Sequence, residues 1–169
     1  MVLGNGNTLV CLDKFGQVKD FYFPYVGQEN HVGSNQTHKI GVFVDNKMCW
    51  IDNGEWNIDI GFERNSMVSQ MKASNEKIKI SIESSDLIYN EKNIFLRKIV
   101  LTNGDSRVRN IKIFLNQQFK IGDTNHADTA YFSSTVESVI HYKGRRVFLV
   151  GGILDNKPFD DYSIGFCGI

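Results

Sequence analysis

One short segment of the sequence combines aromatic rings with amides, a carboxylate and an imidazole. It reads Asp-Phe-Tyr-Phe-Pro-Tyr-Val-Gly-Gln-Glu-Asn-His over residues 20–31. Aromatic faces stack on sugar rings and amides hydrogen-bond sugar hydroxyls, so this composition suits carbohydrate binding. The alternative is that Phe21 and Phe23 face the core, while the tyrosines pack at a strand–loop boundary or a domain interface. The candidates for sugar binding or for a domain interface are Tyr22, Tyr25, Gln28, Glu29, Asn30 and His31.

Paired carboxylates are the second feature with chemical potential, because glycoside hydrolysis uses two of them. The close pairs are Asp52 with Glu55 and Asp160 with Asp161. Both pairs lie in polar, turn-like stretches, where a carboxylate stays ionised and solvated. A general acid needs a raised pKa instead. We therefore assign no catalytic residue in this chain.

The sequence motifs give little support for a metal site, a phosphate site or a catalytic nucleophile. Asp123, His126 and Asp128 could supply ligands, but no second cluster completes a metal set, so a solvated loop is favoured. The stretch Gly4–Asn7 begins like a phosphate loop, yet a strand rather than a helix is expected after it. No G-x-S-x-G nucleophile motif occurs. The sequence predicts neither a metal nor a cofactor.

Charge, cysteine usage and apolar runs limit the partners and the compartment. The 169 residues carry 19 basic and 19 acidic side chains, and this balance argues against nucleic-acid or anionic-membrane binding. The three cysteines, Cys11, Cys49 and Cys167, are too widely spaced for a disulfide framework and are expected to be free thiols. No signal peptide or membrane-length apolar run is evident, which predicts a cytoplasmic protein or a piece of a secreted one.

Composition and periodicity both favour an all-β chain. Alanine is scarce, whereas isoleucine, valine and phenylalanine dominate the apolar residues. Apolar and polar residues alternate through 56–62 and 77–83, the pattern of half-buried strands. Hairpins are expected over 8–23, 40–51 and 94–115, the last turning at Asn103-Gly104-Asp105. Further strands are expected at 128–132, 136–142 and 147–151, with a final one opening at 160–167. About ten short strands predict a single antiparallel sandwich.

Several blocks resemble the start of bacterial and archaeal glucoamylases of glycoside hydrolase family 15. They run over nearly the whole chain in the family's order, and the block at 21–32 is the most specific. The blocks are Leu3–Val10, Phe21–Val32, Gly41–Asp45, Cys49–Asp52, Asp128–Phe132 and Ile140–Gly144.

This resemblance implies an N-terminal antiparallel β super-sandwich of two packed sheets, followed in the family by a helical toroid that carries two catalytic glutamates. It implies inverting hydrolysis of α-glucans by that toroid. None of the family's catalytic motifs matches a position here. Residues 1–169 are thus expected to be a partial, non-catalytic sandwich domain, incomplete at its C-terminal end. Its expected partners are the helical domain of the same parent and, indirectly, the α-glucan substrate.

Other functions stay open on the sequence alone. The chain could be a stand-alone carbohydrate-binding module, or the equivalent domain of a disaccharide phosphorylase, whose toroid follows a related sandwich. It could also be an interaction protein in which the aromatic segment is an interface. An incomplete sheet would leave a free edge, which would favour self-association.

Overall fold

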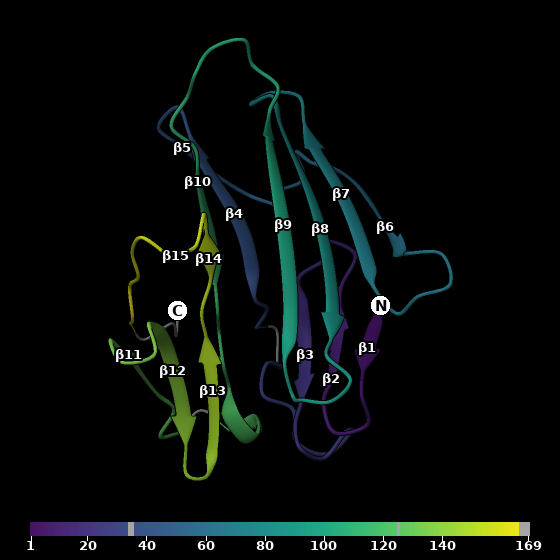
Figure 1. Cartoon of the computed structure of the whole chain (residues 1–169), viewed down its shortest axis with the longest axis vertical. Helices are drawn as coiled ribbons and strands as arrows, with labels where there is room; N and C mark the ends of the chain where they lie inside the picture. The colour runs from purple at the N-terminus through teal and green to yellow at the C-terminus, as the bar shows by residue number, and fades with distance from the viewer. Residues whose placement is uncertain (34–35, 125, 166–169) are drawn as a thin grey trace.

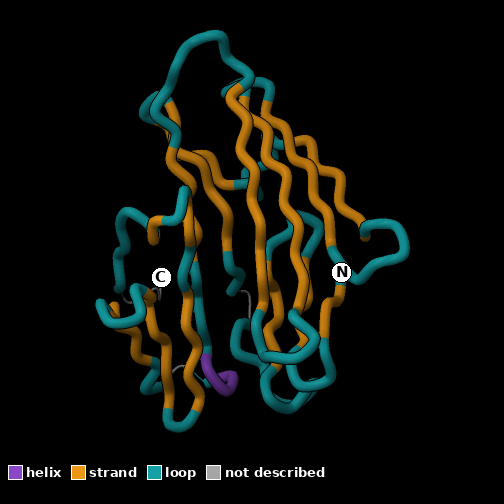
Figure 2. Tube along the Cα trace, viewed as in Figure 1, coloured by secondary structure: helices purple, strands orange, loops and turns teal. Residues whose placement is uncertain are grey.

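The computed structural model describes residues 1–33, 36–124 and 126–165, and its regular structure is almost entirely antiparallel β-strand (Figure 1, Figure 2). The exception is one turn of 3-10 helix at Ile121–Asp123. The predicted all-β, antiparallel fold is confirmed. Among the described residues there is no helix with the length and apolar character needed to cross a membrane.

Within the described residues, fifteen strands form five hydrogen-bonded sheets. The first sheet joins β1 (Val2–Gly4), β2 (Leu9–Leu12) and β3 (Val18–Tyr22). The largest has the order β6-β7-β8-β9 and comprises β6 (Asn57–Phe62), β7 (Ser69–Asn75), β8 (Ile80–Ile88) and β9 (Phe95–Asn103). A third has the order β10-β4-β5, from β4 (Lys39–Val44), β5 (Lys47–Trp50) and β10 (Lys112–Asn116). The remaining two join β11 (Thr129–Ser133), β12 (Ser138–Lys143) and β13 (Arg146–Val150), and β14 (Ile153–Leu154) with β15 (Lys157–Pro158).

Among the described residues, two apolar clusters hold three of these sheets together. The first fills the space between β4–β5 and β7–β8, so the third sheet packs face to face on the largest one as in a sandwich. Its buried members are Ile40, Val42, Val44, Cys49, Ile51, Trp56, Met71, Ala73, Ile80 and Ile82. The second lies between the β1–β3 sheet and the ends of β8 and β9, and includes Leu3, Val10, Leu12, Val18 and Val32. Burial of these side chains is the main force that fixes the layers.

Local turn chemistry explains the two N-terminal hairpins, and both predictions are confirmed. β4 and β5 are joined by Asp45 and Asn46, which both adopt positive φ. Asparagine and aspartate tolerate this conformation, and it matches the twist of the paired strands. In the other hairpin, Oδ1 of Asp13 accepts hydrogen bonds from the N–H groups of Phe15 and Gln17 between β2 and β3.

The predicted hairpin over 94–115 is wrong. β10 does not pair with β9 but with β4, with Phe114 opposite Gly41. The connection after Asn103 is held at the end of the largest sheet, where Arg109 donates hydrogen bonds to the carbonyls of Ile78 and Lys79. Asn103 Oδ1 accepts a further hydrogen bond from Arg109. The Asn-Gly turn is therefore the start of a crossover to the opposite layer.

Smaller differences concern strand ends and strands with few apolar residues. The strand expected over 77–83 begins at Ile80, because residues 76–79 form a turn in which Lys79 has a φ of 51°. β7 was not predicted, since serine and asparagine occupy part of its inward face. The strand expected at 160–167 is absent over 160–165, and Cys167 lies outside the described residues. Cys11 and Cys49 are free thiols, as expected.

Candidate functional site

The segment 20–31 contains the end of β3 and the chain that turns back beside it, where an isolated antiparallel bridge joins Tyr22 and Asn30. The N–H of His31 donates to the carbonyl of Phe21, and the N–H of Phe23 donates to that of Glu29. The bend between them contains a cis Phe23-Pro24 bond and closes through hydrogen bonds to the carbonyl of Tyr25. The candidate side chains are consequently carried on a defined turn rather than on an open loop.

Asn30 is committed to the backbone of this turn. Its Oδ1 accepts hydrogen bonds from the N–H groups of Phe21 and Val32, at 3.0 and 3.2 Å. Its Nδ2 donates to Oδ1 of Asp20 at 2.7 Å. These bonds give Asn30 an internal role in closing the turn.

His31 is completely buried and hydrogen-bonded at both ring nitrogens. Nε2 bonds to the carbonyl oxygen of Phe23, while Nδ1 accepts from the N–H of Gly122 at 3.1 Å. This pattern assigns the proton to Nε2 of a neutral ring. Burial lowers the pKa of His31 below its usual value. The ring joins the segment to the 3-10 turn at Ile121–Asp123 and is closed to solvent.

Glu29 connects the same segment to β13. Its two carboxylate oxygens accept from Nε and Nη2 of Arg146, at 2.7 and 2.8 Å. This bidentate pair holds the pKa of the Glu29 carboxyl below its usual value and raises that of Arg146. Glu29 therefore connects the turn to β13, although Glu29 and Arg146 lie 117 positions apart in the sequence.

The remaining candidates lie toward solvent. Tyr25 is 57% exposed, and Gln28 is exposed beside it on the turn. Tyr22 is half-buried, and burial together with the negative charge of Asp20 raises the pKa of its hydroxyl. The structure thus divides the six candidates. Glu29, Asn30 and His31 make side-chain contacts within the chain, Tyr25 and Gln28 are accessible to a ligand, and the half-buried Tyr22 lies between these two groups. Their assignment to sugar binding or to a domain interface stays a prediction.

The Glu29–Arg146 pair gives a test of how the turn is positioned. We expect Arg146→Gln to speed amide hydrogen exchange in residues 25–31, because the turn loses its bidentate contact with β13. Arg145→Gln is the matched control, since Arg145 is exposed on the adjacent turn. Exchange rates measured by mass spectrometry check this expectation. Equal exchange in both variants would show that Arg146 does not hold the turn.

An aromatic cluster that the sequence did not reveal lies behind the segment. Phe148 of β13 contacts Phe21, Phe23 and His31, with ring centroids 5.6, 6.1 and 4.7 Å away. Phe119 stacks on Phe148 at 5.0 Å and also contacts His38 and His141. We call this set the aromatic cluster; its members are Phe21, Phe23, His31, His38, Phe119, His141 and Phe148. It packs β13 against the β1–β3 sheet.

A buried ion pair was also not predicted from the sequence, although the positions of its two residues indicate it. Asp86 and Arg97 are opposite one another on β8 and β9, in the inward phase of each strand. Nε and Nη2 of Arg97 donate to the carboxylate at 2.7 and 2.8 Å, and Asp86 is 1% exposed. Arg97 also donates to the carbonyl of Gly16 at 2.6 Å. Opposite charges facing inward on successive strands are a sequence indication of such a pair.

The carboxylates considered as possible catalytic pairs are ion-paired or exposed. Asp52 pairs with Lys39 at 2.9 Å and Glu55 with Lys77 at 2.7 Å. Lys77 lowers the pKa of the Glu55 carboxyl, the opposite of what a general acid needs. Asp160 and Asp161 are exposed. Within residues 1–33, 36–124 and 126–165, no group of three or more histidine, cysteine or acidic side chains is placed to hold a metal ion.

Comparison with known proteins relates the chain to a glycosyl hydrolase. It is 22% identical over 164 residues to a protein of Methanocaldococcus jannaschii named "Uncharacterized glycosyl hydrolase MJ1610". The match covers 97% of this chain and 25% of that protein, so the chain spans about a quarter of the relative's length. No family model and no solved structure matches the chain.

Proposed function

We propose that the chain is the N-terminal, non-catalytic scaffold domain of a glucoamylase-type glycoside hydrolase that acts on α-glucans. The observation that carries the proposal is the similarity over nearly the whole chain to one quarter of a protein named as a glycosyl hydrolase. The sequence blocks that resemble glycoside hydrolase family 15 give the proposal its narrower form. In this proposal a helical domain of the same parent performs inverting hydrolysis.

The charges of the described carboxylates support a role without catalysis. Each carboxyl group with a shifted pKa is shifted downward by a basic partner: Glu29 by Arg146, Glu55 by Lys77 and Asp105 by Arg107. A glycosidase needs one carboxylic acid that keeps its proton near neutral pH. These groups are suited to structural ion pairs.

The surface of the later strands supports a scaffold role as well. β10 exposes apolar side chains on both of its faces, and β13 exposes two more. These residues are Ile113, Phe114, Leu115, Val147 and Leu149. The two strands belong to different sheets, and exposed apolar groups in such numbers are typical of interaction surfaces. In the proposed parent, the helical domain is the partner for such a surface; self-association through a free sheet edge is the competing proposal.

A glucose-release assay tests the proposed function. We expect the 169-residue chain to release no glucose from maltooligosaccharides, because it contributes no general acid and base. The control is the same assay with an active glucoamylase added to the chain, which excludes inhibition. Turnover by the chain alone would contradict the scaffold proposal.

A stand-alone carbohydrate-binding module is the second candidate. The exposed ring of Tyr25, with Gln28 beside it, favours this function. Saturable binding of a maltooligosaccharide that Tyr25→Ala abolishes would support it.

A further inference from the structure

β9 lies at one border of the largest sheet, with β8 on one side and no strand of the described chain paired on the other (Figure 1). Its nine residues, Phe95–Asn103, pair with β8 in unbroken register. The exposed fractions agree with this open position. Ile82 of β8 is 1% exposed, whereas Leu101, directly opposite it on β9, is only half-buried. The border of the sheet is therefore accessible to a further strand.

The backbone groups that face this free edge follow from the pairing with β8. Just beyond one end of β9, the N–H of Gly104 donates to the carbonyl of Lys79. Just before the other end, the carbonyl of Ile94 accepts from the N–H of Tyr89. Antiparallel residues alternate between hydrogen-bonded and non-hydrogen-bonded pairs, so the even-numbered residues of β9 bond to β8. The odd-numbered residues direct their N–H and C=O groups to the free edge; they are Phe95, Arg97, Ile99, Leu101 and Asn103.

The edge of β9 lacks most of the features that protect free strands. Such edges are usually short, bulged, rich in lysine or interrupted by proline. β9 is long, regular and free of proline, and its outer face exposes Leu96 and Val100 at 49% and 46%. Arg97 points inward, where Asp86 meets its charge, so Lys98 is the one charged residue on the outer face of β9. An edge of this kind is a template for pairing with another strand.

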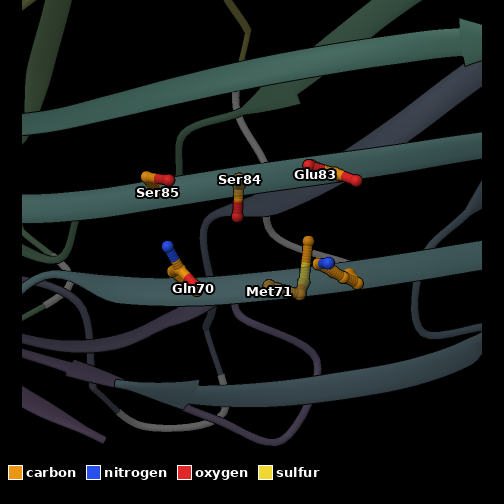
Figure 3. A pocket seen from close by; sticks show the side chains of 6 residues that line it. Gln70, Met71, Glu83, Ser84 and Ser85 are labelled. Atoms are coloured by element: carbon orange, nitrogen blue, oxygen red, sulfur yellow. The ribbon is translucent and has the colours of Figure 1, made fainter. Parts of the chain in front are cut away.

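The middle of the same sheet provides the contrast. β7 and β8 have partner strands on both sides, so their backbone groups are used within the sheet. Figure 3 shows a hollow between them, where Ser84 and Met71 point toward one another. It measures about 150 Å³, below the roughly 300–1,000 Å³ of the usual small-molecule site. The edge of β9 is therefore the stronger candidate for an interaction.

The unpaired backbone groups determine what can cover this edge. A row of N–H and C=O groups along a strand is matched by another extended strand, whereas the backbone groups of a helix are bonded internally. A second copy of the chain offers a strand of the same length with the same free edge. Two-fold pairing of β9 with β9 covers both edges at once. Pairing of β9 with β6, the other border of the sheet, would leave a free edge at each end of the assembly.

We propose that two copies of the chain pair through the free edges of β9, antiparallel about Ile99, so that their largest sheets form one continuous sheet. The five edge-facing residues of each strand exchange about ten hydrogen bonds with the other strand, the number in a typical protein–protein interface. The dimer goes beyond the proposed function, which gives the edge of β9 no role.

Charge favours the register centred on Ile99. This register sets Lys98 of one copy opposite Val100 of the other. A shift of two residues in one direction would oppose the two Lys98 side chains, and like charges directly opposite one another are destabilising. A shift in the other direction would leave Phe95 without a partner. The centred register therefore pairs the most residues and keeps the lysines apart.

Sedimentation velocity of the 169-residue chain over about 1–300 micromolar tests this pairing. We expect a monomer–dimer equilibrium. Val100→Lys should raise the Kd of the dimer about tenfold, because each dimer gains two pairs of opposed lysines. Val100→Glu should lower the Kd about threefold, because Lys98 of the other copy then faces a carboxylate. Ser74→Lys is the matched control, since it adds a lysine to the same outer face on β7, two strands from the edge. Thermal melting verifies that each variant is folded.

Amide hydrogen exchange measured by NMR gives a second readout on the strand itself. The N–H groups of Arg97, Ile99 and Leu101 should exchange slowly only at concentrations where the dimer forms, because they face the free edge. Those of Lys98 and Val100 should exchange slowly in the monomer as well, because they bond to β8. Equal exchange of both sets at all concentrations would contradict pairing through this edge.

The remaining outcomes each overturn the proposal. A chain that stays monomeric up to about 300 micromolar does not pair with itself through β9. A dimer with the same Kd in both Val100 variants and in Ser74→Lys lies on another surface. Assembly that continues beyond the dimer is the result expected for β9 pairing with β6 of the next copy. Glucose release is a separate measurement, so none of these outcomes bears on the proposed scaffold function.

Discussion

Arg97→Met is expected to lower the free energy of unfolding by about 3–5 kcal/mol, the cost of removing one partner of a buried ion pair. Methionine fills much of the same space but leaves the carboxylate of Asp86 without its two guanidinium donors. Among the side chains that the structure describes, the hydroxyl of Ser69 is the one that continues to donate to Asp86, at 3.2 Å. The variant also loses the hydrogen bond that holds Gly16, whose φ is 69°. Urea denaturation measures the change.

Two further variants separate the ion pair from the loss of side-chain packing. Lys98→Met changes the neighbouring, exposed position of β9 and should alter stability only slightly. The double variant Asp86→Leu, Arg97→Met removes both charges and should recover most of the lost stability, because no buried charge is left unpaired. If the double variant were as unstable as Arg97→Met, the hydrogen bond to Gly16 rather than the unpaired carboxylate would be responsible.

Local signals in the sequence predict the strands well and their partners less well. Alternation and turn residues identify β6 and the hairpin of β4 and β5, because both depend on neighbouring residues. The pairing of β10 with β4 depends instead on the layer to which the chain crosses after Asn103. Arg109 determines that path by contacting Ile78 and Lys79, some thirty positions away. An Asn-Gly pair favours a reversal of chain direction, but it does not determine which strand the following strand pairs with.

The same division applies to the candidate site. The aromatic and polar composition of 20–31 predicts a structured element of functional interest, and the structure contains a defined turn there. Its composition does not reveal which side chains face solvent. Arg146 pairs with Glu29, and Phe148 packs against His31. Both partners lie on β13, which no local sequence pattern connects to the turn. Tertiary contacts therefore leave Tyr25 and Gln28 as the accessible members.

Acidification is expected to destabilise the fold through the histidines of the aromatic cluster. His38 is 4% exposed, and burial, with Arg97 and His141 nearby, lowers its pKa from 6.5 to about 3. In the unfolded chain the ring takes up a proton near pH 6.5, so between pH 6.5 and about 3 the unfolded state binds more protons than the folded state. The contribution of neutral His38 to the free energy of unfolding is complete above pH 6.5 and is lost as the pH falls toward 3. At pH 5 the loss from His38 is about 2 kcal/mol, and His31 and His141 act in the same direction.

Denaturation at pH 7 and at pH 5 measures this loss, and two variants assign it. His38→Phe should reduce the difference between the two pH values, since the ring that contacts Phe119 can no longer be protonated. His126→Gln is the matched control, because His126 is exposed and has no ring contact among the described residues. Arg97→Met should also reduce the difference, because the positive charge that opposes protonation of His38 is removed. A difference that stays the same in His38→Phe would mean that acid sensitivity comes from other groups, and the aromatic cluster would then be a purely apolar contact between the sheets.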